Sequence, residues 1–187
     1  MMAEAGPRFA VYSDLFDLPE NQVGEILYGE MHVQPRPSPK HSLASSSLGG
    51  ELVGPFQKGR QGGPGGWWIL DEPELHLDSH VMVPDLAGWR KSRMPELPDT
   101  AWFELAPDWV CEVLSPSTAQ KDRSLKMPLY AQHGVGHVWL IDPEVRTLEA
   151  YELVDGRWVL LGTYREDQRV AIAPFEAVEL PVGELWG

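Results

Sequence analysis

The stretch from Val81 to Asp142 decides the fold of this chain. It holds three apolar runs and one helix-like segment: VMVPDLAGW (81–89), WVCEVLS (109–115), STAQKDRSLKMPLYAQ (117–132) and HVWLID (137–142). Short runs that are apolar at consecutive positions are typical of strands buried on both faces. We therefore expect a buried sheet with a helix after its second such strand.

Two acids and one lysine in this stretch point to a chemistry. Asp85 closes the first run, Glu112 lies inside the second, and Lys126 follows 14 residues later. Carboxylate oxygens bind Mg²⁺ or Mn²⁺, and a bound ion polarises a phosphate and lowers the pKa of a bound water. A lysine can stabilise the developing charge. Asp122, Lys126 and Tyr130 are spaced by four residues and share one face of the expected helix, so Asp122 and Tyr130 are supporting candidates.

Glu112 on its own is compatible with three different roles. A buried charge is costly unless it is paired, so the carboxylate needs compensation. It could form an ion pair with Lys126 or Arg123, lie at a wet strand end, or bind a metal. Asp85 follows Pro84 and could equally belong to a turn. The metal hypothesis gains weight because both acids fall on neighbouring core strands.

Length and composition favour a single domain spanning residues 1–187. Apolar residues make up 43% of the chain, and 15 basic against 28 acidic side chains give a net charge of −13. That charge counts against broad, sequence-blind binding to nucleic acid, though not against an enzyme that meets phosphates in a small cleft. No apolar stretch approaches about 20 residues, and the chain start lacks a secretory pattern. With Cys111 as the single cysteine, we expect a cytoplasmic protein that does not span a membrane.

The flanking segments carry weaker patterns. Residues 24–35 alternate in polarity and predict one strand whose core-facing side chains are Ile26, Tyr28, Met31 and Val33. A helix is expected over 42–53, and Pro128 predicts a kink or a second helical start near Met127. Asp155-Gly156 predicts a tight hairpin. The segment from about 170 to 187 resembles a short strand and a loosely packed tail.

Several of these motifs together resemble a known family. VPDLAGW (83–89), EVLSPST (112–118), WLIDP (139–143) and the pair EILYGEMHV (25–33) and PSPKH (37–41) are similar to the Uma-two family, which is restriction-endonuclease-like and belongs to the PD-(D/E)XK nuclease superfamily. The resemblance covers about residues 20–165. It implies an α/β (α+β) fold, in which a mixed β-sheet is flanked by helices.

The resemblance also assigns roles to residues. Asp85 matches the aspartate of the PD motif, and Glu112 matches the second metal-binding acid. The superfamily's usual lysine, two residues after that acid, is replaced by Leu114, and the family pattern places the lysine on the next helix, at Lys126. Glu30 is the candidate for an auxiliary metal-binding acid. Glu51 on the expected helix is its rival.

The expected function is therefore a Mg²⁺-dependent (or Mn²⁺-dependent) endonuclease that hydrolyses phosphodiester bonds of nucleic acid, with DNA favoured over RNA. Two alternatives stay open. The chain could be a non-catalytic interaction module that retains the nuclease fold, which the charge of −13 favours, or a phosphoesterase acting on another substrate. Eight tryptophans and the apolar C-terminal segment also suggest a homodimer.

Overall fold

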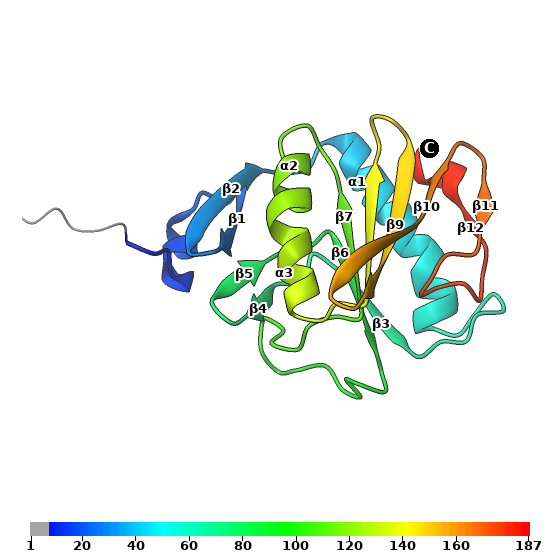
Figure 1. Cartoon of the computed structure of the whole chain (residues 1–187), viewed down its shortest axis with the longest axis horizontal. Helices are drawn as coiled ribbons and strands as arrows, with labels where there is room; N and C mark the ends of the chain where they lie inside the picture. Colours follow the sequence, from blue (N-terminus) through cyan, green and yellow to red (C-terminus); the bar gives the residue numbers. More distant parts are fainter. Residues whose placement is uncertain (1–7) are drawn as a thin grey trace, which may run out of the picture.

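The computed structural model describes residues 8–187 as one large sheet, one small sheet and a two-stranded ribbon (Figure 1). Across the large sheet the strands are β10 (Arg157–Arg165), β9 (Thr147–Val154), β8 (His137–Asp142), β7 (Trp109–Val113), β6 (Leu86–Arg90) and β3 (Trp67–Asp71). Across the small sheet they are β2 (Glu30–Pro35), β1 (Gln22–Leu27), β5 (His80–Met82) and β4 (Leu75–Leu77). The ribbon pairs β11 (Arg169–Val170) with β12 (Leu180–Pro181).

Helices cover both faces of the large sheet. The helical segments are η1 (Tyr12–Asp17), α1 (Pro39–Leu52) with its continuation η2 (Val53–Gln57), the consecutive α2 (Ala119–Lys121), η3 (Asp122–Lys126) and α3 (Met127–Gln132), and η4 (Val182–Leu185). Apolar side chains of α1 join one buried cluster and those of α3 join the cluster on the opposite face. β7 and β8 are parallel while the other pairs in the sheet are antiparallel. The predicted mixed sheet flanked by helices is confirmed.

The helical connection between β7 and β8 changes from a π-helix to an α-helix just before a proline. η3 has π-helical geometry, and α3 begins at Met127 with Pro128 in its first turn. Proline lacks a backbone N–H and its ring clashes with the preceding turn, so a wider turn before it relieves the conflict. The predicted second helical start near Met127 is confirmed. Asp122, Lys126 and Tyr130 are all buried, as their shared face predicts.

The predicted single strand over residues 24–35 is wrong. The chain turns at Tyr28-Gly29, where both residues have positive φ (53° and 79°), and forms the hairpin of β1 and β2. A two-residue turn with positive φ at both positions matches the twist of antiparallel strands. β2 is the edge of the small sheet, so Met31 and Val33 are exposed rather than core-facing, and so is Tyr28.

The C-terminal segment is not a loosely packed tail. Ile172, Phe175, Leu180 and Leu185 are at most 6% exposed and complete the cluster between α1 and the large sheet. Trp139 donates its indole N–H to the Ala173 carbonyl at 3.0 Å, which fixes this segment against β8. The core therefore extends past residue 165. The apolar C-terminal side chains that suggested a homodimer are buried within one chain.

Candidate metal-dependent active site

Antiparallel pairing of β6 and β7 places the backbones of the two predicted acids next to each other. Leu86 pairs with Cys111, so Asp85, directly before β6, comes beside the end of β7 that carries Glu112. The Asp85 carboxylate accepts a hydrogen bond from the Val113 backbone N–H at 2.6 Å through Oδ2. Glu112 is 2% exposed, and every residue of β7 is buried. The sheet register thus fixes both acids on rigid backbone.

Lys126 reaches this site from the helical connection. Its Nζ lies 2.8 Å from Glu112 Oε1 and 3.4 Å from the Val83 carbonyl, and the residue is 1% exposed. The position two residues after Glu112 is Leu114, which is buried in the apolar cluster facing α3. The ammonium group is therefore supplied by a neighbouring helix in place of the strand.

Glu25 is the member of the site that the sequence analysis missed. It is fully buried on β1, and its Oε1 lies 2.8 Å from Lys126 Nζ and accepts the Val83 N–H at 2.9 Å. Its Oε2 accepts a hydrogen bond from Lys121, which also donates to Gln34 Oε1 at 2.7 Å. The sequence offered only part of the signal: a turn at Tyr28-Gly29 separates Glu25 from Glu30, but the pairing of β1 with β5 decides that Glu25 lies on the inner strand.

The supporting candidates also face the cluster. The Tyr130 hydroxyl donates to Glu112 Oε1 at 2.5 Å, which holds the carboxylate between the phenol and Lys126. Burial raises the pKa of the Tyr130 hydroxyl well above its ordinary value, and the Glu112 charge adds to the effect. Asp122 is 3% exposed; burial raises the pKa of its carboxyl, although Lys126 and Lys121 oppose that.

Burial and the two lysines give the two buried glutamates very different pKa values. Burial alone would raise the pKa of Glu25, but the charges of Lys126 and Lys121 outweigh it and lower the pKa to about 2. Burial raises the pKa of Glu112 to about 8, because Lys126 compensates it only in part and three other carboxylates repel its charge. Burial disfavours the charged form of Lys126, yet Glu112 and Glu25 hold its pKa well above the ordinary value. Glu25 is therefore the ionised partner of Lys126, and Glu112 readily binds a proton.

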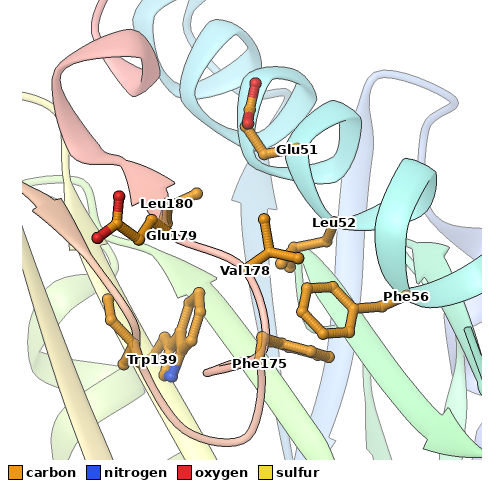
Figure 2. Close-up of a pocket in the computed structure, with 9 residues that line it drawn as sticks. Glu51, Leu52, Phe56, Trp139, Phe175, Val178, Glu179 and Leu180 are labelled. Carbon is orange, nitrogen blue, oxygen red and sulfur yellow. The ribbon is translucent and has the colours of Figure 1, made fainter. Parts of the chain in front are cut away.

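The structure does not bring either predicted auxiliary acid to the cluster. Glu30 is exposed at the start of β2, on the rim of a surface hollow shared with Phe9 and Asp14. Glu51 lies on the side of α1 that faces the C-terminal segment, and Figure 2 shows its carboxylate pointing away from the ring of Phe56. The cavity beside Glu51 measures about 10 Å³, enough for one water molecule. Both assignments are corrected: the third acid of the cluster is Glu25.

A cleft of about 300 Å³ with mixed polar and apolar walls opens next to Asp85. It runs between the end of β2, the start of α1 and the loop after β7; its lining residues include Gln34, Arg36, Ser38, His41, Ser115 and Ser117. His41 Nε2 lies 3.1 Å from Asp85 Oδ1. Burial disfavours a charged His41, but the hydrogen bond and charge of Asp85 raise the pKa of the imidazole overall. Asp85 is therefore reachable from solvent through this cleft.

The oxygen donors of the site fit a hard divalent cation that is held by fewer than three protein side chains. Within residues 8–187, no group of three or more His, Cys, Asp and Glu side chains is arranged to hold a metal ion. Mg²⁺ needs less than that, because it keeps several waters and is held in many enzymes by one or two carboxylates together with substrate phosphates. Asp85, which lines the cleft, and Glu112, which is buried on the adjoining strand, would be the two carboxylates in this role.

A sheet core carrying two acids and a helix-borne lysine, with this topology, is that of a restriction-endonuclease-like nuclease. The family model of Uma2, described as "Putative restriction endonuclease", matches residues 12–183, and the chain belongs to this family. A similar solved structure is a "putative nuclease belonging to DUF820" from Anabaena variabilis ATCC 29413, with a TM-score of 0.74 and 26% identity; the match covers 95% of this chain and 97% of that one. No curated protein matches. None of the helices in residues 8–187 has the length and hydropathy to cross a bilayer.

Proposed function

We propose that the protein is a Mg²⁺-dependent endonuclease that hydrolyses phosphodiester bonds, with DNA favoured over RNA as substrate. Asp85 and Glu112 hold the ion, and Lys126 orients the attacking water and stabilises the charge that develops on the phosphate. The bound ion would polarise the phosphate and lower the pKa of a bound water. The observation that carries the proposal is the contact of Lys126 with Glu112, beside an aspartate fixed to the same strand.

The protein's own side chains prepare the site for this reaction. Glu25, Glu112 and the Val83 carbonyl all contact the Lys126 ammonium, so the charge is fixed in a buried position. A preorganised charge in a site of low dielectric stabilises a transition state without reorganising first. Tyr130 keeps Glu112 Oε1 oriented by its hydrogen bond. Cation binding has to displace the proton that Glu112 binds near neutral pH.

The side chains that line the cleft could bind the phosphates of a nucleic-acid backbone. Arg36 and hydroxyl groups of Ser38, Ser115 and Ser117 line it and can donate hydrogen bonds to phosphate oxygens. Glu72 and Glu144 also line the cleft, so its charge is mixed. We infer that a bound cation would neutralise charge on the scissile phosphate and that affinity away from the cleft is modest, as the net charge of −13 indicates.

One observation favours a second candidate function. The carboxylates of Glu25, Glu112 and Asp85 all have partners within the protein, as a non-catalytic module with a structural ion-pair network would have. The same metal site could also hydrolyse a smaller phosphoester. The homodimer remains a prediction, for which light scattering is the measurement: twice the mass of 20.9 kDa supports it and the single mass refutes it.

Cleavage assays distinguish these candidates. Labelled single- and double-stranded DNA and RNA, and a small chromogenic phosphodiester, are incubated with Mg²⁺ or Mn²⁺ and the purified protein. We expect metal-dependent endonucleolytic cleavage of DNA, lost in Asp85→Asn and in Lys126→Met. Glu30→Gln is the matched control, because this acid is exposed outside the cluster, and it should cleave like wild type. Absence of cleavage of any nucleic acid would refute the nuclease, and turnover of the small diester alone would favour the other phosphoesterase.

A further inference from the structure

His41 connects the start of α1 to the candidate active site. Ser38 is the N-cap of the helix, and its hydroxyl accepts the His41 backbone N–H at 3.3 Å. Pro39 occupies the first turn, where its lack of an N–H costs nothing. The capped first turn therefore fixes the backbone of His41. Since α1 packs on the large sheet through Ala44 and Leu48, the imidazole has a rigid support.

The imidazole holds the one Asp85 oxygen that the backbone leaves free. Oδ2 is bonded to the Val113 N–H at 2.6 Å, and Oδ1 lies 3.1 Å from His41 Nε2. A carboxylate held at both oxygens by groups from two different elements has a defined plane and direction. The pair is also placed between two hollows, of about 300 and 540 Å³, which both have His41 and Asp85 in their walls.

The other ring nitrogen indicates why this contact matters. His41 Nδ1 is buried and has no hydrogen-bond partner within residues 8–187. With Nε2 facing a carboxylate, a proton is assigned to Nε2, and Nδ1 lacks a partner whether or not it carries a proton. Burying an unpaired polar atom is unfavourable, so such atoms are rare in native proteins and tend to have a functional reason. If the contact of Nε2 with Asp85 serves the active site, it explains why the ring is kept here although Nδ1 has no partner.

We propose that His41 is a positioning residue for the metal site, whose Nε2–H orients the Asp85 carboxylate for the cation. The proposal rests on the proposed function, because it needs a cation at Asp85. Side chains that hydrogen-bond to metal-binding groups fix ligand orientation, and their loss costs about 10- to 100-fold in metal affinity or activity. His41 was not singled out by the sequence analysis, since only the fold brings it to Asp85 across 44 residues.

Mn²⁺ titration calorimetry on three variants tests the proposal. His41→Leu removes the donor, and we expect the Mn²⁺ dissociation constant to rise about 10- to 100-fold. His41→Gln keeps an N–H donor at a similar reach and should restore most of the affinity. His137→Leu is the matched control. His137 is also a half-buried histidine, but it pairs with Trp109 at the other end of β7 and should leave the constant unchanged.

Two readouts separate positioning from a structural role. Thermal unfolding of the metal-free variants shows whether each one folds, and cleavage is measured over a range of Mn²⁺ concentrations. A positioning role predicts that His41→Leu needs more Mn²⁺ for half-maximal cleavage and recovers activity at saturation. Unchanged affinity in a folded His41→Leu would refute the proposal and leave the nuclease intact. Tighter binding would also refute it, because His41 would then compete with the cation. No Mn²⁺ binding by wild type would overturn both proposals.

Discussion

Replacing Glu112 by glutamine should change how stability depends on pH. The Glu112 carboxyl has a pKa of about 8 in the folded protein, and its ordinary value of 4.5 stands for the unfolded state. Between these values the folded state retains a proton that the unfolded state has released, so stability falls as pH rises from 4.5 to 8. A shift of this size corresponds to about 5 kcal/mol at most. Glutamine resembles the protonated carboxyl and does not titrate.

Urea unfolding followed by tryptophan fluorescence at pH 5, 6.5, 8 and 9 measures the effect. At pH 5 the variant and wild type should have similar free energies of unfolding, because Glu112 is protonated in the folded wild type. The variant should become more stable than wild type by several kcal/mol as pH approaches 8, with no further change above it. Parallel curves for the two proteins between pH 5 and 8 would refute the reasoning, since they would show that the buried carboxyl titrates normally.

Three further substitutions test the same cluster. Lys126→Met leaves Glu112 and Glu25 without their shared cation, and should cost about 3–5 kcal/mol in urea unfolding at pH 7; a cost below 1 kcal/mol would contradict the ion pairing. Glu25→Gln removes a carboxyl of pKa about 2, whose stabilising effect is present above pH 4.5 and lost as pH falls towards 2. Acid titration should therefore show a shallower loss of stability in the variant than in wild type. Tyr130→Phe removes the hydrogen bond to Glu112 and should cost about 1–3 kcal/mol, measured by thermal unfolding; an unchanged midpoint would show that the bond contributes nothing.

The sequence predicted the centre of the fold well because its signals there are local. The runs around Glu112 and in β8 are apolar at nearly every position, as is typical of a strand buried on both faces. The pairing of an acid in one strand with a lysine in the following helix was also predictable, because the crossover between parallel neighbouring strands returns over the same sheet face.

The errors occurred where distant packing decides the structure. The alternating pattern continues through the Tyr28-Gly29 turn and predicts one strand, so Glu30 and Glu51 were the candidates while the buried acid, Glu25, lies on the other strand of the hairpin. The C-terminal segment appeared loosely packed because its apolar residues have no regular period, yet Phe175 packs against Trp67 and Trp139. The role of His41 depends on α1 meeting β6, and no local pattern encodes that contact.

Anomalous diffraction from crystals soaked in Mn²⁺ tests the central claim most directly. It locates the cation without assuming any activity. We predict a peak at the carboxylates of Asp85 and Glu112, with Lys126 next to it. A peak elsewhere, or no peak while Lys126 keeps its contact with Glu112, would contradict the account and favour a structural ion-pair network in a chain that does not cleave nucleic acid.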